Sequence, residues 1–175
     1  GIALSLDDND SDVHRILSAV SLTHYDHDRA SYHQARAIAL NPNDDLIVVQ
    51  QGEMPTWLGQ PEEGINWIRK AMRLNPYHPE RFWNHLGLAH FAAHGYGEAI
   101  EAFNHISVPD FTHHAFLAAA HAQAGHEAEA RNHAAAVLAF EPGFRINSYL
   151  ANLRYKHRED VDHHRASLLK AGLPE

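Results

Sequence analysis

The chain has 175 residues, of which 45% are hydrophobic and 21% charged, so its composition is that of a folded globular domain with a core of its own. The formal net charge is −8 at pH 7, with 22 acidic against 14 basic residues, which argues against a nucleic-acid partner and against docking on anionic lipid. There is no cysteine, and no apolar run approaches the roughly 18–20 residues of a membrane span, so we expect a cytoplasmic protein without thiolate sites, disulfides or membrane insertion.

An internal repeat of about 34 residues organises the chain. Ala3, Ala37 and Ala71 open similar short apolar stretches, and their spacings are 37 − 3 = 34 and 71 − 37 = 34. The distance from Pro76 to Pro142 is 142 − 76 = 66 residues, which is two further periods of 33. Repeats of this length are typical of stacked helix–turn–helix units.

The pattern inside each period predicts two helices. Apolar residues recur at spacings of three and four, and Asn-Pro or Glu-Pro pairs stop the second helix of a unit. Gly59, Gly95 and Gly125 are predicted to take the left-handed turn inside three hairpins, and Pro55 to kink a helix or end it early. In chain order the predicted helices lie near 11–23, 29–40, 45–58, 61–74, 79–93, 96–106, 111–124 and 127–140.

The repeat divides the chain into three parts. Residues 1–10 look like the second-helix remnant of a preceding repeat, so we expect the chain to be a fragment of a longer protein. Four helical hairpins follow within 11–142, at about 11–44, 45–78, 79–110 and 111–142. Residues 143–175 leave the repeat and predict capping helices at 144–155 and 159–170, whose charged residues suit a solvated face.

Small and aromatic residues recur at fixed places in the hairpins. Ala30, Gly64, Ala99 and Ala130 stand early in the second helices, where two helices cross closely. The third unit shows the fullest pattern, in Trp83, Leu86, Gly87, Tyr96, Ala99 and Phe103. With these residues the chain resembles the tetratricopeptide repeat (TPR) family. The resemblance implies an all-α, TPR-type α-solenoid, a right-handed superhelix of antiparallel helix pairs with a C-terminal helical cap. It also implies a non-catalytic scaffold for protein–protein interaction.

Three stretches of the sequence suggest a resemblance to a narrower group within the TPR family. They are the stretch 71–80 followed by Trp83, the alanine-rich stretch 117–125, and the closing stretch 168–175. Together they resemble the C-terminal TPR region of bacterial class III adenylate/guanylate cyclase-like proteins. The resemblance implies that catalytic residues lie outside this chain, and it is compatible with a homodimer. The same kind of region follows winged-helix domains, so a transcriptional regulator or an assembly factor is the alternative.

Partners of such superhelices bind on the concave face, which is lined by the first helices of the units. The phase of the repeat predicts a groove for a protein or peptide partner. Trp57, Leu88 and Phe91 would form its apolar patch, and the alternative is that Trp57 and Phe91 pack against a neighbouring helix or against further repeats upstream. The predicted partner-binding residues are Arg15, Leu22, Val49, Glu53, Trp57, Arg81, Asn84, Leu88, Phe91 and Gln123.

Seventeen histidines raise a further alternative, a histidine-rich metal-binding protein. His90 and His94 have the four-residue spacing of a helical metal site, but no third ligand is evident. The acidic run from Asp7 to Asp12 lacks the later ligands of a calcium loop. We therefore predict no metal, no cofactor and no catalytic residue in this chain. Because many histidines titrate near pH 6.5, we expect lower stability or solubility below roughly pH 6.

Overall fold

A computed structural model describes residues 9–175, and the segment 1–8 of the expected second-helix remnant lies outside the described residues. The described part is all-helical, without strands, which confirms the predicted fold class. Its helices are α2 (Ser11–Thr23), α3 (His27–Leu40), α4 (Asp45–Trp57), α5 (Pro61–Leu74), α6 (Arg81–Ala92), α7 (Tyr96–Phe103), α8 (Phe111–Ala124), α9 (Glu127–Phe140), α10 (Ile146–Leu150) and α11 (Arg158–Lys170).

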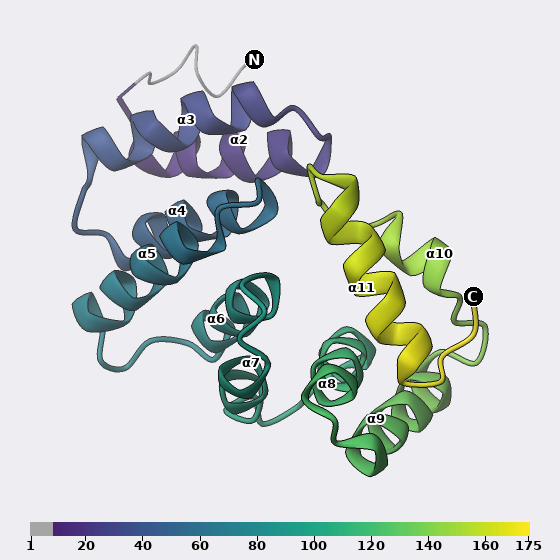
Figure 1. The fold of residues 1–175 in the computed structure, drawn as a ribbon. Helices are drawn as coiled ribbons and strands as arrows, with labels where there is room; N and C mark the ends of the chain where they lie inside the picture. The colour runs from purple at the N-terminus through teal and green to yellow at the C-terminus, as the bar shows by residue number, and fades with distance from the viewer. Residues whose placement is uncertain (1–8) are drawn as a thin grey trace.

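The helices α2 to α9 form successive antiparallel pairs that follow one another along an arc (Figure 1). The pair α2/α3 stands at one end and α8/α9 at the other, while α11 spans the open side of the arc between them. The assignment of repeat units to the sequence bounds given above stays a prediction.

Aspartates start the first helices of three pairs. The side chains of Asp10, Asp44 and Asp110 accept hydrogen bonds from backbone N–H groups in the first turns of α2, α4 and α8. Those amides have no partner within their own helix, so a carboxylate just before the helix satisfies them. The caps set where the first helices begin, and with that the register of the side chains along each of them.

The turn inside each hairpin needs one residue in the left-handed region. Gly59 and Gly125 take it, with φ of 78° and 81°, as predicted. In the third hairpin the prediction for Gly95 was wrong by one residue, because His94 has φ 61° and Gly95 has φ −82°. In the first hairpin Tyr25 has φ 58°. A bulky side chain adopts this backbone conformation only at some cost in strain.

The crossing of the two helices in a hairpin explains the small residues. A Cβ atom built on Gly52 would lie 2.6 Å from Cγ1 of Ile68 and 2.7 Å from the carbonyl oxygen of Gly64. A Cβ on Gly87 would lie 2.8 Å from the ring of Phe103. The helix backbones therefore approach so closely that no side chain fits at these positions.

The C-terminal part departs from the expected cap. The predicted helix 144–155 is only five residues long, Ile146–Leu150, and the following residues run as turns and extended chain up to α11. The carbonyls of Ala151 and Leu153 accept hydrogen bonds from the hydroxyl of Tyr25, which lies in the first hairpin. In the third hairpin α7 ends at Phe103 rather than near residue 106. Pro55 lies inside the last turn of α4, which ends at Trp57.

Replacing Gly52 by alanine should destabilise the fold by about 1–3 kcal/mol, because the added methyl group has to push α4 and α5 apart. Gly97→Ala is the matched control, since Gly97 is helical and a Cβ there meets nothing within 4 Å. The control should be neutral or slightly stabilising, as alanine is the better helix former. Urea unfolding monitored by circular dichroism measures both, and equal midpoints for the two variants would contradict the close crossing.

Candidate functional site on the concave face

The predicted partner-binding residues lie on the first helices of the four hairpins. Arg15 and Leu22 are on α2, and Gln123 is on α8. Those on the middle helices are Val49, Glu53 and Trp57 of α4, and Arg81, Asn84, Leu88 and Phe91 of α6. The structure separates them into a covered part and an open part of the same face. Their role in binding a partner stays a prediction.

The covered part lies under the chain's own C-terminal tail, which we define as residues 144–173. Trp57 is 5% exposed, and its ring meets the ring of Tyr155 edge-on with centroids 5.0 Å apart. Phe91 is 1% exposed, and the ring of His164 lies 4.9 Å from it. The two residues thus pack against a neighbouring segment, as the second interpretation of the sequence had it. That segment is the C-terminal tail.

Hydrogen bonds tie the tail to the ends of the first helices. The N–H of Lys156 donates to the carbonyl of Trp57 at 2.9 Å, and Nε2 of His157 lies 3.0 Å from the carbonyl oxygen of Leu58. These carbonyls stand at the C-terminus of α4, where helical partners are lacking. Further along the tail, Nε2 of Gln123 donates to the hydroxyl of Ser167 at 2.7 Å. The tail therefore crosses from the second hairpin to the fourth.

An ion pair marks the boundary between the covered and the open part. Nη1 of Arg154 in the tail pairs with Oε1 of Glu53 on α4. Both side chains are partly buried, with 34% and 14% of their surface exposed, so water screens the pair less than it screens a surface pair.

The open part consists of two adjoining hollows that share Glu53 and His85. The first, of about 110 Å³, is lined by Arg15, Leu46, Val49, Gln50, Glu53, Arg81 and His85. The second, of about 170 Å³, lies between α4, α6, α8 and the tail, and its lining includes Asn84, Leu88, Thr112, Phe116 and Arg154. Residues from three successive hairpins thus meet at one place on the concave face.

The electrostatics of the open part centre on His85. Its Nδ1 is buried and has no hydrogen-bond partner among residues 9–175. Burial lowers the pKa of His85, against the attraction of Glu53, so its imidazole is neutral at pH 7. Arg15 is held by Asp12 at 2.8 Å, whereas Arg81 is exposed and makes no ion pair with the described residues. The hollow therefore offers a cation and a neutral imidazole to whatever enters it.

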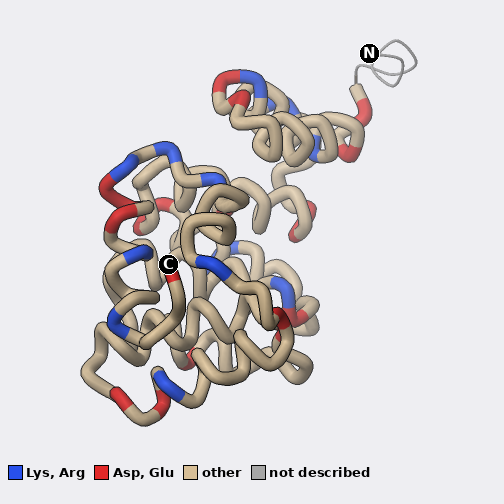
Figure 2. Tube along the Cα trace, turned by 90° about the vertical axis from the view of Figure 1, so that its right-hand side faces the viewer, with Lys and Arg blue, Asp and Glu red and all other residues tan. Residues whose placement is uncertain are grey.

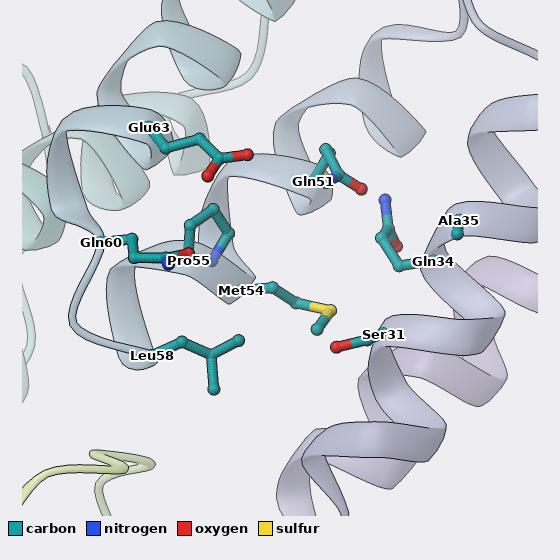
Figure 3. Close-up of a pocket in the computed structure, with 9 residues that line it drawn as sticks. All are labelled: Ser31, Gln34, Ala35, Gln51, Met54, Pro55, Leu58, Gln60 and Glu63. Carbon is teal, nitrogen blue, oxygen red and sulfur yellow. The ribbon is translucent and has the colours of Figure 1, made fainter.

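Another hollow, of about 190 Å³, lies between the first and second hairpins (Figure 3). Its lining is mostly neutral, with Ser31 and Gln34 of α3 facing Gln51, Met54 and Pro55 of α4. Glu63 is the charged group at its edge. Nothing in this lining combines groups in the manner of a catalytic or metal site, so we place the candidate site on the concave face.

The histidines pair across helices in a way that the sequence reasoning missed. Nδ1 of His14 lies 3.0 Å from Nδ1 of His33, and Nδ1 of His114 lies 2.9 Å from Nδ1 of His133. Both pairs are 19 residues apart, and equal spacing in the first and fourth hairpins was the available signal. Nδ1 of His94, whose spacing from His90 raised the metal-binding alternative, lies 2.9 Å from the hydroxyl of Tyr96.

Within residues 9–175 no group of three or more histidine, aspartate or glutamate side chains is arranged to hold a metal ion. Part of the acidic run considered as a calcium loop lies in the described chain, where Asp10 caps α2 and Asp12 pairs with Arg15. In the view of Figure 2, basic and acidic residues of the described trace are interspersed. Among the described helices, none has the length and apolar character needed to cross a membrane.

Solved structures with similar folds are TPR proteins. YrrB, described as a TPR protein with an unusual peptide-binding site, is 17% identical with a TM-score of 0.63, covering 97% of this chain and 88% of its own. PilW, a type IV pilus biogenesis factor, is 16% identical with a TM-score of 0.74, covering 95% and 80%. MamA is 19% identical with a TM-score of 0.62, covering 92% and 89%. A scan against protein-family models gives no match, and neither does a comparison with curated proteins. The fold is thus a TPR-type α-solenoid.

The contact between the tail and the concave face predicts a dependence of stability on pH. His164 is fully buried among Phe91, Phe116 and Tyr155, and burial lowers its pKa from 6.5 to about 3. Burial also lowers the pKa of His163 beside it and of His133 on α9. Below pH 6.5 these histidines become protonated in the unfolded chain but stay neutral in the folded one. The free energy of unfolding is therefore highest above pH 6.5 and falls as the pH drops toward 3.

We expect His164 alone to lower the free energy of unfolding by roughly 1–2 kcal/mol between pH 7.5 and 5.5. Urea titrations at the two pH values measure it. In His164→Gln, which removes the titrating ring, the difference between the two pH values should shrink. An unfolding midpoint that is the same at both pH values in the unaltered protein would contradict the prediction.

Proposed function

We propose that the domain is a scaffold that binds a protein or peptide partner in the open part of its concave face. The observation that carries the proposal is the convergence of Arg15, Val49, Glu53 and Arg81, from three successive hairpins, on one hollow. A solenoid that brings equivalent positions of its repeats together presents an extended surface for a partner. The similar fold of YrrB, described as a TPR protein with an unusual peptide-binding site, supports the proposal by analogy.

The residues of the hollow favour a particular kind of peptide. Arg81 is an exposed guanidinium without an ion pair in the described chain, so an acidic side chain of the partner would find a bidentate donor there. Asn84 and His85 line the adjoining hollow and can hydrogen-bond a peptide backbone. Glu53 is already engaged by Arg154, so it adds little repulsion toward an acidic segment. We therefore infer an extended peptide with at least one acidic residue.

The parent protein is a second part of the proposal. The narrower resemblance of the sequence supports a C-terminal regulatory region of a bacterial adenylate/guanylate cyclase, which acts in the cytoplasm and associates through this domain as a homodimer. The alternative parents are a transcriptional regulator or an assembly factor. Reading the coding sequence upstream of Gly1 separates them: a cyclase catalytic domain supports the first parent, and a winged-helix domain or another reading frame overturns it.

A display library of short random peptides, selected on the purified domain, tests the binding site. Selected peptides should be enriched in acidic residues, and Arg81→Glu should weaken their binding at least tenfold because it reverses the charge in the hollow. Arg131→Glu is the matched control, since Arg131 is equally a surface arginine but lies on the second helix α9 and pairs with Glu127. Selected peptides that bind both variants as well as the unaltered domain would refute the site.

A further inference from the structure

We propose that the covered part of the concave face is a second binding surface, which the tail occupies in the free protein. A helical segment of a partner displaces the tail from Trp57, Phe91 and Phe116. The inference rests on the proposed scaffold function but concerns the covered part of the concave face, not the hollow around Arg81.

The tail contacts the concave face in the same way as a bound partner of a solenoid would contact it. It meets three successive first helices at their C-terminal ends, through the carbonyls of Trp57 and Leu58 on α4, the ring of Phe91 on α6 and the amide of Gln123 on α8. Figure 1 shows α11 spanning the open side of the arc from the end near α2 to α8, which it contacts, and not stacking behind α9 as one more repeat. A structural cap would continue the stack, whereas this segment uses the face that the repeats share.

The fit between the tail and the face leaves polar atoms without partners. Six buried side-chain atoms of the described residues lack a hydrogen bond. Nε1 of Trp57 is one on the face beneath the tail, and the hydroxyl of Tyr149 and Nε2 of His164 are two within the tail itself. A fourth, Nδ1 of His85, lines the hollow that Arg154 and Leu153 of the tail help to enclose. A buried donor without an acceptor costs free energy relative to water. The tail is therefore bound less favourably than a segment that satisfies Trp57 and His85 and brings no unpaired polar group of its own.

The covalent link explains how such a contact persists. Glu141, Pro142 and Gly143 are exposed and join α9 to the tail. A segment tethered by so short a link has a high effective concentration, so even a moderate contact is populated in the free protein. A partner has to compete with the tail, and it can do so by satisfying Nε1 of Trp57 and Nδ1 of His85, which the tail leaves unpaired.

The tail also indicates the chemistry of that partner. Arg154 pairs with Glu53 while the next residue, Tyr155, packs on Trp57. Nine residues later His164 lies between Phe91 and Phe116, and Leu168 is fully buried. The partner segment should accordingly have a basic residue followed by an aromatic one, then a helix with buried apolar residues. An acceptor within reach of Nε1 of Trp57 would make it the stronger ligand.

Hydrogen exchange of the intact, unaltered domain is the first test. Amides of residues 158–170 should exchange as a unit of their own, at least tenfold faster than the most protected amides of α4 to α9, because the tail can leave while the hairpins stay folded. Exchange of α11 at the same rate as the hairpin cores, only through global unfolding, would overturn the proposal.

A labelled synthetic peptide of residues 151–175 is the second test. It should bind the double variant Arg154→Ala/Tyr155→Ala, whose own tail is weakened, at least tenfold more tightly than the unaltered domain. A peptide in which Tyr155 and Leu168 are both alanine is the control and should bind neither protein.

Equal binding of the native peptide to both proteins would overturn the proposal. If the double variant does not fold, the exchange experiment on the unaltered domain decides. Arg81→Glu should leave this binding unchanged, so failure here and failure of the peptide site are distinguishable.

Discussion

The packing of the tail against the inner side of the arc is the interaction that joins hairpins lying far apart in the chain and decides which part of the concave face is covered. In a helical solenoid each hairpin contacts only its neighbours, and stability is a sum of nearest-neighbour terms. Here the hydroxyl of Tyr25 reaches Ala151 across 126 residues of sequence, and Glu53 reaches Arg154 across 101. These contacts link the first hairpins to the last part of the chain. One apolar cluster accordingly includes Leu22 of α2 together with Leu168 and Leu173 of the tail.

The same packing decides what is left for a partner. It buries Trp57 and Phe91, which together would otherwise form an exposed aromatic patch, and it leaves Arg81 and the hollow beside His85 open. The concave face is thereby divided into an apolar part that the tail covers and a polar part that the tail leaves open. A single domain could then respond to two kinds of segment, an acidic extended peptide in the open part and an apolar helix that replaces the tail.

The hairpins were predictable because their determinants are local. The 34-residue period, the prolines after second helices and the aspartates before first helices all act within a few residues of the structure that they specify. Gly64 could be recognised as a crossing position for the same reason. The exception is the turn between α6 and α7, where the left-handed residue is His94 and not the neighbouring Gly95, and where Nδ1 of His94 lies 2.9 Å from the hydroxyl of Tyr96.

The place of the tail was not predictable in this way. Residues 144–175 have no periodic relation to the repeats, and their contacts join residues a hundred or more positions apart. The predicted groove residues were found from the phase of the repeat, but an aromatic residue on a concave face has the same pattern whether a partner or the chain's own tail covers it. Likewise the pair of His114 and His133 becomes visible only once α8 and α9 are placed side by side.

The position of the tail can be measured directly by nuclear Overhauser spectroscopy on the labelled protein. The account predicts cross-peaks between the indole of Trp57 and the ring of Tyr155, whose centroids are 5.0 Å apart, and between the rings of Phe91 and His164, at 4.9 Å. The pair Phe91 and Phe116, 5.3 Å apart within the hairpins, serves as the internal reference. A spectrum that shows the reference pair but neither of the contacts to the tail would contradict the account.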